Sequence, residues 1–155
     1  MQSNSTLETK KIAKNIAEKL LTTSFKNNQI PLIVGLVGDL GSGKTFFVKN
    51  FLSALGVKAK VHSPTFVLMR EYEIKKLQLA QNKYSKVYHI DVYRLNNKKD
   101  LEHLNFSEIL KEKNSIVFIE WADKIKKLLP KKTVWINFKH GNLENERVIE
   151  INTIL

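Results

Sequence analysis

The chain has no cysteine and little proline, glycine or arginine, and each shortage excludes a class of protein. Without cysteine there is no disulfide framework, no thiolate metal site and no cysteine nucleophile. Three prolines and six glycines in 155 residues form no flexible linker, so we expect a single domain over residues 1–155. Apolar runs stay far below the roughly 18 residues that span a bilayer, and no secretory pattern opens the chain. We therefore expect a cytoplasmic protein without a membrane partner.

Positive charge dominates, with a formal net charge of +11. Such a surface favours an anionic partner. Only Arg70, Arg94 and Arg147 of the 26 basic residues are arginines, however, and a dedicated phosphate reader is expected to use more arginine forks. The lysines are scattered from Lys10 to Lys139, which favours a solvated surface and leaves nucleic-acid contact as the alternative.

Hydrophobic patterning predicts an α/β domain with a mixed central sheet flanked by helices. A capping box at Ser5-Thr6-Leu7-Glu8 opens the first expected helix, whose apolar stripe runs to Leu21. A polar loop at 78–83 joins two strand patterns, which predicts an antiparallel pair. The expected strands are 32–37, 66–74, 87–91, 115–119, 133–138 and 147–154, of which 66–74 and 87–91 form the pair. The other expected helices lie around 47–55, 100–111 and 122–129.

A glycine-rich stretch between the first strand and the second helix carries the strongest chemical signal. Its sequence, GDLGSGKT, matches G-x-x-x-x-G-K-[ST], a motif expected only about 0.004 times by chance here. Glycines let backbone N–H groups converge on phosphate oxygens, and the following helix adds its positive end. The motif predicts a P-loop NTPase-like three-layer fold. The nucleotide-binding candidates within it are Asp39, Leu40, Gly41, Ser42, Gly43, Lys44 and Thr45.

A phosphate loop of this kind needs a carboxylate at a neighbouring strand end to hold magnesium. Glu120 follows four apolar residues, as expected for a buried strand beside the loop, so we assign it to Mg²⁺ together with the Thr45 hydroxyl. Asp91 ends a less apolar strand and becomes a second acidic group, able to orient water or metal near the γ-phosphate. Taken alone, either carboxylate is equally compatible with an exposed strand end.

Two further motifs bear on the nucleotide. Residues 97–100 spell N-K-x-D, the guanine-reading signature of GTPases, but no buried strand precedes them and they come before Glu120. We interpret them as a solvated turn, which leaves ATP as the nucleotide. Pro64 fixes a bend before Thr65, whose hydroxyl could close on the γ-phosphate and magnesium as switch threonines do, although spacing alone favours a plain turn into a strand. The four histidines show no zinc-like spacing.

Four landmarks stand in order along the chain: GDLGSGKT, HSPTF, YHIDVYRL and VFIEWADKI. Together they resemble the TsaE family, the P-loop ATPases of bacterial tRNA threonylcarbamoyladenosine biosynthesis. The resemblance implies a small domain that binds ATP and Mg²⁺ and hydrolyses slowly until engaged. It also implies the partners TsaD and TsaB, the pair that transfers a threonylcarbamoyl group to N6 of A37 in tRNA. Any tRNA contact would then come through that complex.

The same resemblance assigns roles to individual positions. It makes Lys44 the phosphate residue, Thr45 and Glu120 the magnesium contacts, and Asp91 the essential aspartate. Lys44, Asp91 and Glu120 are therefore the catalytic candidates.

Other assigned positions are more peripheral. Thr65 matches a switch-like loop, Trp121 the aromatic beside the glutamate, and Thr9 a position near the adenine. Ser42 replaces a common alanine, which is harmless where backbone amides bind the phosphates. The long basic loop at 75–86 is less typical of the family.

Two other functions fit parts of the same pattern. A small-molecule kinase would use the same loop but needs an arginine-rich lid, and three arginines are few for one. A basic RNA-binding module would keep the nucleotide as a structural element, and its tRNA affinity would fall steeply with salt. The absence of an obvious arginine finger predicts a low intrinsic turnover.

Overall fold

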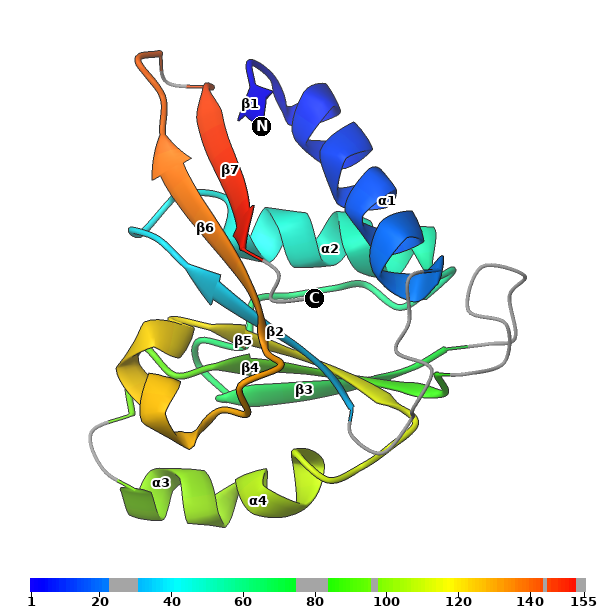
Figure 1. Ribbon diagram of the computed structural model, residues 1–155, viewed down its shortest axis with the longest axis vertical. Helices are drawn as coiled ribbons and strands as arrows, with labels where there is room; N and C mark the ends of the chain where they lie inside the picture. The colour runs from blue at the N-terminus through cyan, green and yellow to red at the C-terminus, as the bar shows by residue number, and fades with distance from the viewer. Residues whose placement is uncertain (23–30, 75–83, 96–97, 144, 153–155) are drawn as a thin grey trace.

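A computed structural model describes residues 1–22, 31–74, 84–95, 98–143 and 145–152 (Figure 1). Seven strands form one sheet in the order β1-β7-β6-β2-β5-β4-β3. The strands are β1 (Gln2–Ser3), β2 (Leu32–Val37), β3 (Met69–Glu73), β4 (Lys86–Asp91), β5 (Ser115–Glu120), β6 (Val134–His140) and β7 (Arg147–Asn152). The helices are α1 (Thr6–Thr22), α2 (Lys44–Ala54), α3 (Lys98–His103), α4 (Phe106–Ile109) and the 3₁₀ segment η2 (Ala122–Leu128).

The sheet is mixed, as the sequence predicts. The four central strands β6, β2, β5 and β4 run parallel to one another. β7 pairs antiparallel with β6, β3 pairs antiparallel with β4, and β1 pairs antiparallel with β7. Helices α1 and α2 cover one face, and α3, α4 and η2 lie against the other (Figure 1). Because parallel strands point the same way, the carboxyl ends of β2, β4 and β5 meet at one edge.

The first helix begins at the predicted capping box. The Glu8 N–H donates to Ser5 Oγ at 3.2 Å, and the Glu8 carboxylate accepts from the Asn4 N–H at 2.7 Å, so two otherwise unpaired donors are satisfied. Ala13 and Ile16 of the predicted stripe are buried in the core shared with α2. The N-terminal helix therefore packs where its apolar spacing predicts.

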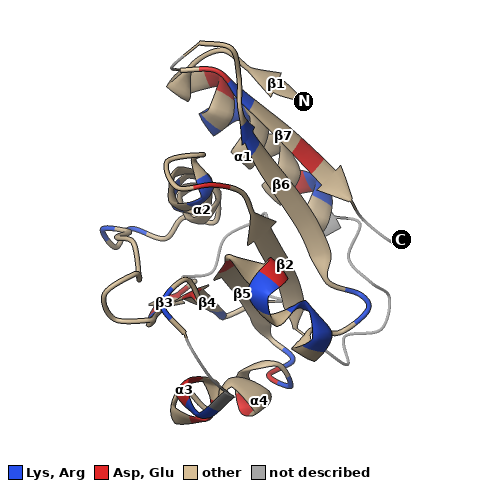
Figure 2. Cartoon of the chain, turned by 90° about the vertical axis from the view of Figure 1, so that its left-hand side faces the viewer, with Lys and Arg blue, Asp and Glu red and all other residues tan. Residues whose placement is uncertain are grey.

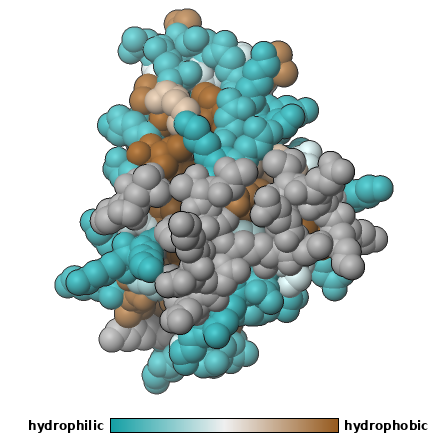
Figure 3. Space-filling view, turned by 45° about the vertical axis from the view of Figure 1, so that its right-hand side comes forward, coloured by the Kyte–Doolittle hydropathy of each residue, from teal (hydrophilic) through white to brown (hydrophobic). Residues whose placement is uncertain are grey.

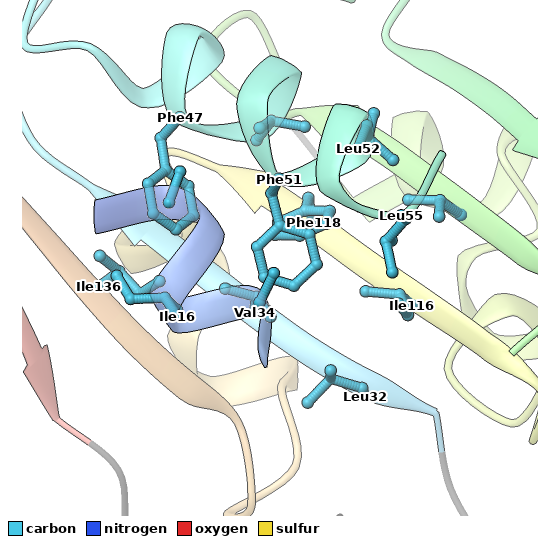
Figure 4. Packing of buried hydrophobic residues seen from close by; sticks show 14 of the residues in the cluster. Ile16, Leu32, Val34, Phe47, Phe51, Leu52, Leu55, Ile116, Phe118 and Ile136 are labelled. Carbon is cyan, nitrogen blue, oxygen red and sulfur yellow. The ribbon is translucent and has the colours of Figure 1, made fainter. Parts of the chain in front are cut away.

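Helix α2 packs against the sheet through Phe47 and Phe51, which lie near Phe118 and aliphatic side chains such as Val34 (Figure 4). Phe51 meets Phe118 of β5 edge-on with ring centroids 4.9 Å apart, and Phe47 meets Phe138 of β6 at 5.5 Å. All four side chains are at most 2% exposed. Edge-to-face packing of this kind fixes the helix over the sheet, and with it the glycine-rich loop at its N-terminus.

The opposite face carries a second apolar layer. Ile33, Val117 and Ile119 alternate with the α2-facing residues along their strands and pack with the short helices α3, α4 and η2. Among the described residues no helix is long and apolar enough to cross a membrane. Apolar groups near the top of Figure 3 are flanked by hydrophilic ones, and basic positions are spread over several elements in Figure 2.

Two predicted elements, the strand at 66–74 and the helix at 100–111, differ in the structure. Residues 66–68 do not belong to the strand: Val67 N–H closes a turn on Pro64 O, and Leu68 adopts a left-handed φ of 63°. The helical pattern at 100–111 is broken by Asn105, whose φ of 51° separates α3 from α4. The polar loop at 78–83 and the end of the last predicted strand lie outside the described residues.

Candidate functional site

The glycine-rich loop follows β2 directly and ends at the first turn of α2. At Gly38 a Cβ would lie 2.3 Å from the backbone oxygen of Phe138, so only glycine allows this close passage of β6. Gly43 is the N-cap of α2 with a left-handed φ of 101° and no side-chain capping bond. The first N–H groups of the helix are thus left uncapped by a side chain, an arrangement that fits an anionic ligand.

Lys44 lies against the loop that it follows. Its Nζ donates to Gly38 O at 2.6 Å and Asp39 O at 2.8 Å, and it sits 4.2 Å from the ring centre of Trp121. Burial lowers the pKa of this ammonium from its ordinary 10.5, while nearby carboxylates, Glu120 foremost, act in the opposite direction. A negatively charged ligand next to Lys44 would stabilise the ammonium that burial deprives of hydration.

Strand register brings the two predicted carboxylates together. Asp91 pairs with Glu120 across β4 and β5, and Glu120 pairs with Leu36 at the end of β2. Glu120 continues the α2-facing series of Ile116 and Phe118, so its side chain points toward the glycine-rich loop. The strand-end argument from sequence therefore describes the observed geometry.

Glu120 bridges α2 and the sheet. Its Oε1 and Oε2 accept from the Thr45 hydroxyl at 2.8 and 3.0 Å, and Oε1 also lies 2.7 Å from His89 Nε2. The residue is 3% exposed. A buried carboxylate next to a helix-terminal hydroxyl supplies the hard oxygen ligands that Mg²⁺ prefers.

Asp91 is the second acidic group of the site and is also 3% exposed. Its Oδ1 accepts from the Tyr93 N–H at 2.9 Å, and its Oδ2 accepts from the Thr65 hydroxyl. Thr65 is linked in turn to the Ser63 hydroxyl at 2.7 Å. The loop before β3 is thereby joined to the end of β4.

These groups line one open pocket of about 490 Å³. Its walls are Leu40, Gly41, Gly43, Lys44, Thr45, Phe46, Ser63, Thr65, Phe66, Asp91, Tyr93, Arg94, Glu120 and Trp121. In the described part of the chain, no three His, Asp or Glu side chains converge as a protein-only metal cage. Mg²⁺ beside phosphates is commonly held by one or two protein oxygens together with phosphate oxygens and water, and Thr45 and Glu120 offer such a pair.

Three predicted binding residues do not line the pocket. Asp39 belongs to the loop but is exposed, and Ser42 is buried with its Oγ lacking a partner in the described chain. Thr9 lies in α1, where its hydroxyl contacts Ser3 Oγ at 2.7 Å and Ser5 O at 3.2 Å.

The N-K-x-D stretch is also absent from the pocket walls. Lys98, Lys99 and Asp100 form the first turn of α3, and Asn97 lies outside the described residues.

Sequence reasoning missed several neighbours of the site. Tyr93 packs on Trp121 with ring centroids 4.8 Å apart, and the Arg94 guanidinium lies 4.7 Å from the ring of Phe66. On the far side of the loop, Arg147 donates to Gly41 O at 3.2 Å. The landmarks YHIDVYRL and VFIEWADKI contain Tyr93 and Trp121 but do not show that their rings meet, because each of these contacts joins distant segments.

Comparison with known proteins agrees with this architecture. A family model described as threonylcarbamoyl adenosine biosynthesis protein TsaE matches residues 3–149. The chain belongs to the TsaE family. The tRNA threonylcarbamoyladenosine biosynthesis protein TsaE of Rickettsia felis is 36% identical over 151 residues, covering 97% of this chain and 77% of that protein. Its Bacillus subtilis namesake is 35% identical over 147 residues, covering 95% and 80%.

A solved structure supports the same assignment. The crystal structure of Bacillus subtilis YdiB matches with a TM-score of 0.71 at 29% identity, covering 100% of this chain and 84% of that one. The predicted α/β, P-loop-like fold and the predicted TsaE resemblance are therefore both confirmed.

Proposed function

We propose that this TsaE-family chain is a Mg²⁺-dependent ATPase that acts on the TsaB–TsaD pair during tRNA N6-threonylcarbamoyladenosine formation. The observation that carries the proposal is the bond between Thr45 and Glu120, placed beside Asp91 in one pocket at the N-terminus of α2. A hydroxyl, two carboxylates and an uncapped helix end are the groups that phosphoryl transfer from a triphosphate requires.

Phosphate binding is assigned to the loop and its lysine. Backbone N–H groups of residues 39–45 and the positive end of α2 would contact the phosphate oxygens. Lys44 needs only to exchange its bonds to Gly38 O and Asp39 O for phosphate oxygens. The resemblance implies a position near the adenine for Thr9, and the proposal includes that role.

The metal ligands in this proposal are Thr45 and Glu120. Their oxygens lie 2.8 and 3.0 Å apart, so both could bind one cation, with the Thr45 hydroxyl keeping its proton and coordinating through a lone pair. Bound there, Mg²⁺ would neutralise charge on the phosphates.

Asp91 is the group that we assign to the attacking water. Its carboxylate can accept a hydrogen bond, and then a proton, from a water molecule in the pocket. The Tyr93 N–H and the Thr65 hydroxyl fix the orientation of the carboxylate. Through Thr65, a ligand that contacts Asp91 would also affect the loop before β3.

Slow turnover by the isolated chain follows from the arginines. Arg94 is the arginine among the pocket walls, and its guanidinium lies 4.7 Å from the centre of the Phe66 ring. A transition state that lacks an arginine contact loses several orders of magnitude in rate. We therefore expect the TsaB–TsaD pair to complete or reorder the site.

The direct test is magnesium-dependent ATP hydrolysis with and without purified TsaB–TsaD. We expect slow turnover alone, clear stimulation by the pair, and loss of at least about 100-fold in Lys44→Ala and Glu120→Ala. Lys49→Ala, an exposed lysine of the same helix, is the matched control and should retain turnover. Full activity in both site variants, or fast unstimulated hydrolysis, would contradict the proposal.

A further inference from the structure

A buried histidine of β4 contacts the site from within the core. His89 is 0% exposed and pairs in register with Phe118 of β5 and Arg70 of β3. It lies two residues after Val87 and two before Asp91, so it shares their α2-facing side of the sheet. An apolar side chain would fill this space without desolvating two ring nitrogens, so packing alone does not account for the residue.

The polar partner of this ring is Glu120. His89 Nε2 lies 2.7 Å from Glu120 Oε1, and because a carboxylate only accepts, the ring N–H donates. The contact is diagonal, from His89 to the residue two beyond its register partner Phe118, a reach that long side chains span on one sheet face. His89 Nδ1 has no hydrogen-bond partner in the described chain, so the ring's hydrogen bonding there is directed at Glu120.

The carboxylate is thereby held from two sides. Thr45 donates to Glu120 from α2, at 2.8 Å to Oε1, and His89 donates to the same oxygen from β4. Without the histidine, a side chain with three torsions would be restrained by one hydroxyl alone, and a metal entering the site would compete for that hydroxyl. Groups that orient a metal ligand in this way typically change metal affinity by about 10- to 100-fold when removed.

We propose that His89 is a positioning residue that holds the Glu120 carboxylate against Thr45 so that both can bind one Mg²⁺. The assignment rests on the proposed function of this site. It predicts that the histidine affects the contribution of magnesium to nucleotide binding and leaves the metal-free contacts of the loop and Lys44 untouched.

The test is equilibrium binding of a non-hydrolysable ATP analogue, measured once with Mg²⁺ and once with EDTA. In His89→Leu we expect the magnesium-dependent gain in affinity to fall by about tenfold or more, with the EDTA value unchanged. His89→Gln keeps an N–H donor at similar reach and should retain most of the gain. His89→Asn is one methylene shorter and should behave like the leucine variant. In a Glu120→Ala background the glutamine and asparagine variants should no longer differ.

Tyr88→Phe is the control, because it alters the neighbouring residue on the opposite face and removes a hydroxyl that bonds to Glu112 and Lys86, not to Glu120. If His89→Leu does not fold, the comparison of the glutamine and asparagine variants decides, since both bury an amide. A wild-type magnesium gain in His89→Leu, or equal behaviour of glutamine and asparagine, would overturn the positioning role alone. A wild-type chain whose nucleotide binding ignores Mg²⁺ would overturn the proposed function as well.

Discussion

The glycine-rich loop and the wall facing it form one pocket in different ways. The loop is continuous in sequence, and its geometry is a property of the backbone from Gly38 to Thr45. The wall is assembled from the ends of β4 and β5 and from the segment around Thr65, which lie far apart in the chain. The loop therefore depends on glycines and local bonds, whereas the wall depends on side chains that strand register brings together.

This difference predicts separate roles, with phosphate binding by the loop and hydrolysis by the side chains of the wall. Lys44 finds its partners in carbonyls five and six residues away, so the loop keeps its form with little help from the wall. Asp91 and Glu120 owe their proximity to pairing between strands 29 residues apart in register. Changes in the wall should therefore affect turnover more than stability, and changes in the loop backbone should do the reverse.

Replacing Asp91 should give the largest effect. In Asp91→Asn the charge that we propose accepts a proton from water is lost, so we expect stimulated ATP turnover to fall about 10²- to 10⁴-fold. The neutral amide fits the same space, and the free energy of unfolding should change by less than about 1 kcal/mol. Hydrolysis assays and urea unfolding measure the two quantities. Glu102→Gln, an exposed carboxylate of α3, is the matched control; a similar loss there would show that the assay responds to charge alone.

A glycine of the loop should show the opposite pattern. Gly38→Ala forces a Cβ to within 2.3 Å of Phe138 O at a φ of 146°, so we expect a loss of about 2–3 kcal/mol in unfolding free energy. Gly41→Ala also has a positive φ, 73°, but its nearest neighbour is a His140 side chain at 3.8 Å, so it should cost only about 1 kcal/mol. Urea denaturation compares the two. Equal losses would mean that the close approach to β6 contributes nothing beyond the dihedral.

Sequence predicted the loop well and the wall in part, for the same reason. The motif fixes Gly43, Lys44 and Thr45 because their relation is local, and the pattern of apolar strands ending in acids located Asp91 and Glu120. The order of strands in the sheet decides which side chains meet, and no short-range pattern reports it.

The parts that sequence missed share a dependence on distant contacts. The sequence did not predict the contact between His89 and Glu120, because the two residues lie 31 positions apart. The turn at 66–68 read as strand because alternation continues through Phe66 and Leu68, yet Phe66 is 83% exposed at the pocket mouth. Asn105 interrupts a helical pattern because it adopts a left-handed φ, which the apolar spacing of the surrounding residues does not predict.

The smallest expected effect lies where the wall meets the loop before β3. Thr65 joins the two through its hydroxyl bond to Asp91, a contact that in the proposed mechanism orients the carboxylate without taking part in bond breaking. Thr65→Val keeps the shape and removes the donor, so we expect stimulated turnover to fall about tenfold, which corresponds to about 1.4 kcal/mol of transition-state stabilisation. Thr65→Ser restores the hydroxyl and should remain within about threefold of the wild-type rate. If valine and serine reduced turnover equally, the methyl group rather than the hydrogen bond would be the functional part, and Asp91 would be oriented by the Tyr93 N–H alone.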